Sequence, residues 1–147
     1  MGAGLSDFQR LRGSSEEVTV SARQSEGKSM QLKLSNRVVN DILIVVCNGR
    51  IVFGEEAGAI REFVKAALTK HKQIILNLKN VSYIDSGGLG TLVGLYTSAH
   101  SAGGDVRLSQ LTERVGQLLQ VTKLVTVFAT FNSDDEAVRS FGKTARA

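Results

Sequence analysis

The 147-residue sequence has no proline, no tryptophan, two histidines and one cysteine. A disulfide framework within the chain is excluded, because Cys47 has no second cysteine to pair with. A structural zinc site built on several thiolates is excluded for the same reason. No apolar run approaches the roughly 18 residues that a transmembrane helix needs, so we expect no membrane insertion.

Residues that could form a catalytic or metal centre are equally scarce. His71 and His100 stand alone, without the His-x-x-x-His, Glu-x-x-His or Cys-x-x-Cys spacing of metal and redox sites. The sequence also lacks the Gly-x-x-x-x-Gly-Lys pattern of a phosphate-binding loop. We therefore predict no catalytic residue, no metal site and no cofactor, which favours a binding or regulatory protein.

The formal net charge is +4, which raises the question of a nucleic-acid partner. The basic residues are scattered singly over several predicted elements, and no stacking aromatic side chains lie between them. A nucleic-acid surface normally gathers its charge into a patch or run. We therefore predict an ordinary solvated surface and no direct contact with nucleic acid.

Residues 1–29 differ in composition from the remainder of the chain. They are rich in serine and glycine, poor in large apolar side chains, and carry four basic and four acidic residues. Such a segment buries too little apolar surface to offset its ordering entropy. We predict that 1–29 is a disordered arm or reflects a mis-assigned start upstream of Met30, with a domain over 30–142 and a flexible tail over 143–147.

The hydrophobic periodicity of the domain alternates between strands and helices. Strands are predicted over 32–38, 42–47, 74–78, 106–108 and 125–131, and helices over 55–71, over 89–99, after Thr112 and after Ser133. Strands that alternate with helices imply βαβ units. The fold class is therefore α/β, with a mixed, mostly parallel sheet of four to five strands packed against about four helices. Cys47 lies in the second strand and is predicted to be an inert core thiol.

One glycine-rich turn, Asp-Ser-Gly-Gly-Leu-Gly over 85–90, lies between a buried strand and a helix. Sites in open α/β sheets favour this carboxyl edge of the strands. Ser86 is predicted to be the N-cap of the helix, and the helix N-terminus would tolerate an anion there. The pattern alone leaves two alternatives open, a simple capped turn and a site that binds a nucleotide or another anion.

Residues 83–90, preceded by the buried strand at 74–78, resemble the signature of the STAS domain family, and the similarity extends over most of 30–142. Single-domain members of that family include bacterial anti-sigma factor antagonists. The resemblance implies that Ser86 is phosphorylated by a serine kinase that is also the anti-sigma factor, and that a cognate phosphatase resets it. Asp85 matches the acidic neighbour of the phosphoacceptor. A cytoplasmic location is implied as well.

The resemblance also implies a partner-binding surface, for which we predict Asp85, Ser86, Gly87, Gly88, Leu89 and Phe53. Two positions depart from the family pattern: Val52 stands where antagonists commonly have aspartate, and Gly87 where a second serine or threonine is frequent. Phe53 and Leu95 could make the docking face more apolar, although ordinary packing is the alternative for both. A STAS subunit that docks on a transporter ATPase is the alternative function.

Overall fold

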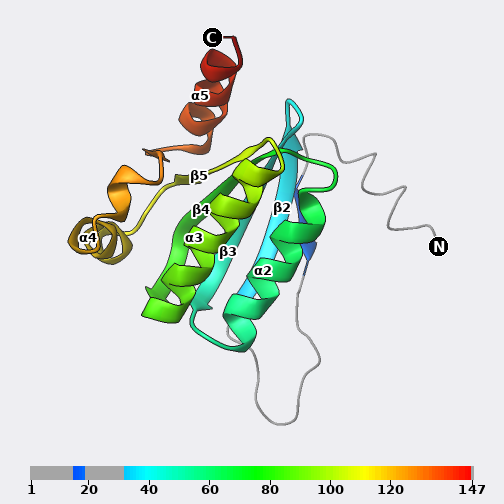
Figure 1. Ribbon diagram of the computed structural model, residues 1–147. Coiled ribbons are helices and arrows are strands. Elements are labelled where there is room, and N and C mark those ends of the chain that lie inside the picture. The colour runs from blue at the N-terminus through cyan, green and yellow to red at the C-terminus, as the bar shows by residue number, and fades with distance from the viewer. Residues whose placement is uncertain (1–14, 19–31, 147) are drawn as a thin grey trace, which may run out of the picture.

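The computed structural model describes residues 15–18 and 32–146 (Figure 1). The sheet of this part has the strand order β1-β2-β3-β4-β5-β6. These strands are β1 (Ser15–Val18), β2 (Leu32–Val39), β3 (Ile42–Ile51), β4 (Gln73–Ile84), β5 (Asp105–Ser109) and β6 (Thr130–Phe131). β1, β2 and β3 pair antiparallel, and β3 to β6 pair parallel. The prediction of a mixed, mostly parallel α/β sheet is confirmed.

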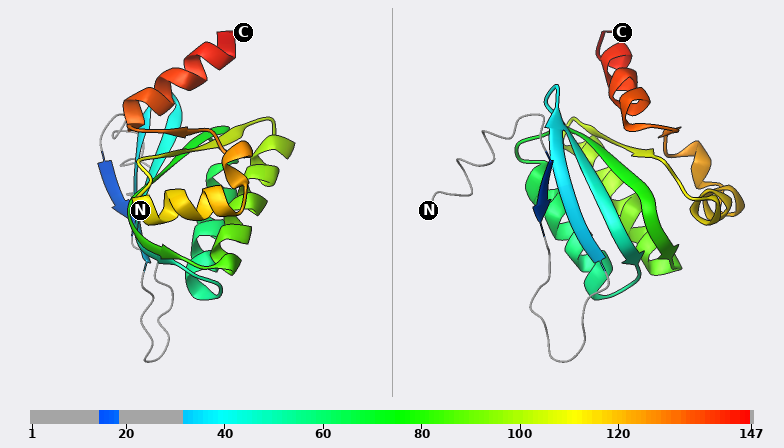
Figure 2. Two further views of the ribbon diagram at one scale, coloured as in Figure 1. Left: turned by 90° about the vertical axis from the view of Figure 1, so that its left-hand side faces the viewer. Right: turned by 180° about the vertical axis from the view of Figure 1, so that it is seen from behind.

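The helices are α2 (Glu55–Ala67), α3 (Ser86–Ser101), α4 (Glu113–Val121) and α5 (Asp134–Arg146), with a 3-10 turn, η1 (Leu124–Thr126). Helices α2 and α3 lie side by side across one face of the sheet, and the view from behind shows the strands in front of them (Figure 2). Each helix connects two parallel strands, as βαβ units require. This arrangement brings the first turns of α2 and α3 to the same edge of the sheet.

Two groups of buried side chains hold these layers together. Leu43, Val45 and Cys47 of β3 point into the main core beneath α2 and α3, while Ile42 and Ile44 point to the other face and contact α5. This alternation follows from the two-residue side-chain period of a strand. Complete burial raises the pKa of the Cys47 thiol to about 12. The prediction of an inert core thiol is therefore supported, because the reactive thiolate is not formed at neutral pH.

Three boundaries differ from the sequence-based prediction. The β-branched run predicted as a strand over 125–131 forms η1 and only the two-residue strand β6, because Lys123 adopts a left-handed conformation (φ 66°) that turns the chain. Ser15–Val18, within the arm predicted to be disordered, pairs as a strand with β2. Helix α5 continues to Arg146, past the boundary predicted at residue 142. The remainder of residues 1–29 lies outside the described residues.

A polar network fixes the start of α5 against the sheet. The Asp134 carboxylate accepts hydrogen bonds from Arg37 of β2 (3.1 Å), Asn77 of β4 (3.0 Å) and Ser109 of β5 (2.5 Å). Asn77 and Ser109 are buried. One carboxylate thus joins three strands to one helix, and it is the acceptor for two buried donors, Asn77 and Ser109.

Replacing Asp134 by alanine is expected to destabilise the fold by about 2–4 kcal/mol, because buried donors left without an acceptor lose their hydrogen bonds without regaining water. Chemical denaturation of the purified chain measures this. Asp135→Ala is the matched control, since Asp135 also lies in the first turn of α5 but is exposed, and its loss should cost no more than about 0.5 kcal/mol. Equal losses for both variants would contradict the role given to the network.

Candidate partner-binding site

The predicted site residues lie where two neighbouring parallel strands end. In the β3–β4 pairing, Arg50 lies opposite Tyr83 and Ile51 opposite Ile84. The segment from Val52 to Gly54, which leads into α2, is therefore adjacent to the start of α3. Phe53, 32 positions before Asp85 in the sequence, is brought into contact with it.

Asp85 joins these two segments through its carboxylate. One oxygen accepts a hydrogen bond from the backbone N–H of Gly88 (2.7 Å), and both oxygens accept from the backbone N–H of Phe53 (3.1 and 3.2 Å). Asp85 has an extended backbone and is the N-cap of α3, so the prediction that Ser86 is the cap was wrong. The physical reason is that the carboxylate reaches an N–H group of the first turn and one of the neighbouring segment at the same time.

Because Asp85 is the N-cap, Ser86 is the first residue of α3. Its side chain is exposed, and its hydroxyl makes no hydrogen bond within the described part of the chain. A serine that is neither buried nor bonded is available to a second protein. It also lies where the N–H groups of a helix N-terminus favour a negative charge.

The two glycines after Ser86 allow two different close approaches. A Cβ atom on Gly87 would lie 2.5 Å from the Cβ of Phe53, so the Phe53 side chain occupies the space above that position. A Cβ atom on Gly88 would lie 2.0 Å from the carbonyl oxygen of Ile51, so α3 contacts the end of β3 directly. A side chain at position 87, where the family pattern often has serine or threonine, would therefore require the Phe53 side chain to move.

The structure divides the predicted partner-binding residues into two groups. Ser86 and Phe53 are exposed, with 79% of the Phe53 surface accessible, and Asp85 and Gly87 lie half-buried between them. Gly88 and Leu89 face the core, so they position the turn. Leu95, considered above as a possible docking residue, is buried in the main core and reaches the surface only at the bottom of a groove.

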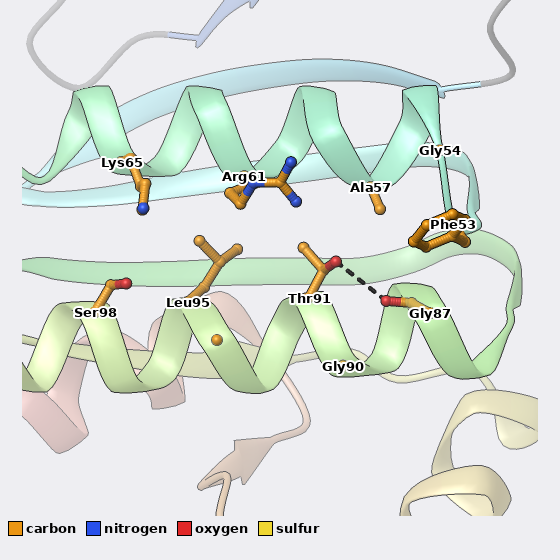
Figure 3. A pocket seen from close by; sticks show the side chains of 11 residues that line it. Phe53, Gly54, Ala57, Arg61, Lys65, Gly87, Gly90, Thr91, Leu95 and Ser98 are labelled. Atoms are coloured by element: carbon orange, nitrogen blue, oxygen red, sulfur yellow. Dashed lines mark hydrogen bonds between the residues drawn. The ribbon is translucent and has the colours of Figure 1, made fainter.

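That groove was not predicted from the sequence. It has a volume of about 580 Å³ and runs between α2 and α3 from Phe53. Figure 3 shows Arg61 and Lys65 of α2 pointing toward Thr91, Leu95 and Ser98 of α3, and the hydrogen bond from the Thr91 hydroxyl to the Gly87 carbonyl (3.1 Å). The sequence indicates this groove only weakly, because the cations lie on α2 and the glycines on α3, and no pattern within one helix relates the two sets.

Among residues 15–18 and 32–146, no group of three or more His, Cys, Asp or Glu side chains is arranged to hold a metal ion. No helix within these residues combines the length and apolar character needed to cross a bilayer.

Comparison with known proteins identifies the family. The family model of the STAS domain matches residues 33–137, so this chain belongs to the STAS domain family. The anti-sigma-B factor antagonist of Bacillus subtilis (strain 168) is 33% identical over 85 residues, which cover 58% of this chain and 76% of that protein. The resemblance stated from the turn at 85–90 is thereby confirmed.

Solved structures agree on the fold. The crystal structure of tm1081 from Thermotoga maritima superimposes with a TM-score of 0.65 at 27% identity, covering 71% of this chain and 91% of that one. The Bacillus cell fate determinant SpoIIAA in its phosphorylated form has a TM-score of 0.59 at 19% identity, covering 75% and 98% of the two chains. The second likeness shows the fold alone.

The pH dependence of stability offers a direct measurement of the Asp85 cap. Hydrogen bonding from Gly88 in the first place, and from Phe53 and Gly87, lowers the pKa of Asp85 below its ordinary value of 3.8. A carboxyl whose pKa is lower in the folded state stabilises the fold fully above its unfolded pKa, and this contribution is lost as the pH falls through the folded pKa.

The stability difference between the wild type and Asp85→Asn is therefore expected to be largest near neutral pH and to shrink below about pH 4. Thermal unfolding of both proteins from pH 7 to pH 3 measures it. A difference that stays constant over this range, or that grows as the pH falls, would contradict the assignment of Asp85 as an ionised cap.

Proposed function

We propose that this chain is an anti-sigma factor antagonist of a bacterial partner-switching system. It binds an anti-sigma factor that is also a serine kinase, so that the sigma factor is released. Phosphorylation of Ser86 by that kinase ends the complex, and a cognate phosphatase restores the unmodified form. The role requires no catalytic group of this chain and places it in the bacterial cytoplasm.

The observation that carries the proposal is the environment of Ser86. Its hydroxyl is exposed and unbonded within the described residues, and its two chain neighbours, Asp85 and Gly87, both lie against Phe53. The relative from Bacillus subtilis reported above is an anti-sigma-B factor antagonist. Together these features support a contact surface with a modifiable serine at its centre.

The chemistry of a phosphate at this position supports a switch. Phosphorylation adds about −1.5 to −2 charges at neutral pH. The N-terminus of α3 accommodates this charge within the chain itself. The adjacent Asp85 carboxylate carries a further negative charge. A partner surface that fits the unmodified turn would therefore meet two neighbouring negative groups after phosphorylation. The fold can therefore persist while the complex dissociates.

The test uses the purified chain, ATP and each candidate anti-sigma factor kinase of the source genome, with intact-mass analysis. One phosphate is expected on the wild type and on Ser101→Ala, which alters an exposed serine at the other end of α3. No phosphate is expected on Ser86→Ala. A wild type that stays unmodified with every kinase, or a phosphate that persists in Ser86→Ala, would reject the proposal.

A further inference from the structure

We propose that the groove between α2 and α3 binds an acidic helix of the partner protein. The inference rests on the proposed function for the identity of the partner, and it adds the chemistry of the segment that the partner presents. The groove begins at Phe53 and Gly87, the residue that follows Ser86, and continues along both helices. A contact made at the turn can therefore extend over the groove without interruption.

The charge of the groove defines the kind of segment that fits it. Arg61 and Lys65 are exposed, line the same side, and form no ion pair within the described part of the chain. Among the described residues that line the groove, none is acidic. Because the two cations are four residues apart on α2, they lie one helical turn from each other. Two carboxylates at the same spacing on an adjacent helix would match them.

The shape of the groove is set by two glycines of α3. Gly90 and Gly94 are exposed, and a Cβ atom at either position would meet no atom within 4 Å. They differ in this from Gly87 and Gly88, whose missing side chains admit Phe53 and Ile51. Glycine inside a helix is less favourable than alanine, so these two positions lower the helix propensity of α3 without serving a contact inside the chain. The absence of side chains there lets the backbone of a second helix approach closely.

The apolar residues of the groove complete the match. Phe53 is exposed at one end, and Leu95 forms part of the floor. An amphipathic helix would place its apolar face on the exposed Phe53 ring and its carboxylates against the cations, as in other helix-in-groove complexes. A phosphate on Ser86 would lie at the end of this site and repel an acidic segment, which agrees with the proposed switch.

The first experiment measures the affinity of the chain for the anti-sigma factor kinase that phosphorylates Ser86. The double variant Arg61→Glu with Lys65→Glu is expected to bind about tenfold or more weakly. Lys79→Glu with Arg114→Glu, which changes two exposed cations outside the groove by the same charge, should bind within about threefold of the wild type. Equal affinity of the groove variant and the wild type would overturn the inference while leaving the proposed function intact.

The glycines give a test that separates binding from stability. Gly90→Ala with Gly94→Ala is expected to raise the unfolding temperature and yet weaken binding about tenfold or more. Gly116→Ala in α4, another helical glycine with nothing within 4 Å, should raise the unfolding temperature and leave binding unchanged. A glycine double variant that binds like the wild type would contradict the close approach of a helix.

A further experiment tests the groove without any kinase. If no kinase binds the chain, the proposed function fails, and this experiment still decides whether the groove binds an acidic helix. The probe is a stapled helical peptide with two glutamates four residues apart and a leucine on the same face, compared with its dilysine counterpart. In NMR spectra of the labelled chain, the glutamate peptide alone is expected to shift the amide signals of Gly90 and Gly94. Shifts with both peptides, with neither, or only with a single-stranded oligonucleotide would overturn the inference.

Discussion

Replacing Gly88 by alanine is expected to destabilise the fold by about 3 kcal/mol or more. The added Cβ would lie 2.0 Å from the Ile51 carbonyl oxygen and 2.8 Å from its carbon. These are backbone atoms of a central strand, so they cannot move aside as a flexible side chain would. The start of α3 would have to shift away from β3.

Thermal and denaturant unfolding of Gly88→Ala measures the effect, with a fall in the unfolding temperature of about 10 °C or more. Gly90→Ala is the matched control, because it lies in the same helix and meets nothing within 4 Å. Its expected effect has the opposite sign, a stabilisation of up to about 1 kcal/mol. If both variants were destabilised alike, or if Gly88→Ala were as stable as the wild type, the close approach to Ile51 would not be the reason for glycine at 88.

Sequence periodicity predicts best the elements whose apolar side chains form the main core. The apolar run at 42–47 and the run at 74–78 become the central strands β3 and β4, and the 55–71 stripe becomes α2. The apolar positions in these segments correspond to the side chains that are buried between the sheet and the helices. The run at 125–131 is also largely apolar, but there the left-handed residue Lys123 turns the chain and only Thr130–Phe131 forms a strand.

The candidate site was predicted less completely, for a reason that lies in its construction. The turn at 85–90 is local in sequence, and its glycines and its serine were identified directly. The cap role of Asp85 depends on the N–H of Phe53, a residue distant in sequence, and was assigned wrongly to Ser86. Arg61 of α2 and Gly90 of α3 line the same groove. The periodicity within each helix does not show that residues of the two helices lie together.

Phosphorylation of Ser86 is expected to weaken binding to the anti-sigma factor about 100-fold or more, while the fold stays intact. A 100-fold loss of affinity corresponds to about 2.8 kcal/mol, which a few unfavourable charge contacts can supply at a desolvated interface. Calorimetric titration of the phosphorylated and unmodified chains measures the affinity. Ser86→Ala, which cannot be modified, should keep binding after treatment with kinase and ATP.

Thermal unfolding and salt dependence distinguish how the phosphate acts. Because the anion lies at the N-terminus of α3, the unfolding temperature of the phosphorylated chain should equal or exceed that of the unmodified chain. If repulsion causes the loss of binding, the ratio of the two affinities should shrink as ionic strength rises, since the Debye length falls from about 10 Å at 0.1 M to about 3 Å at 1 M. A ratio independent of salt would mean that the phosphate blocks the partner sterically. A lowered unfolding temperature would mean that it acts through the fold, against the mechanism proposed for Ser86.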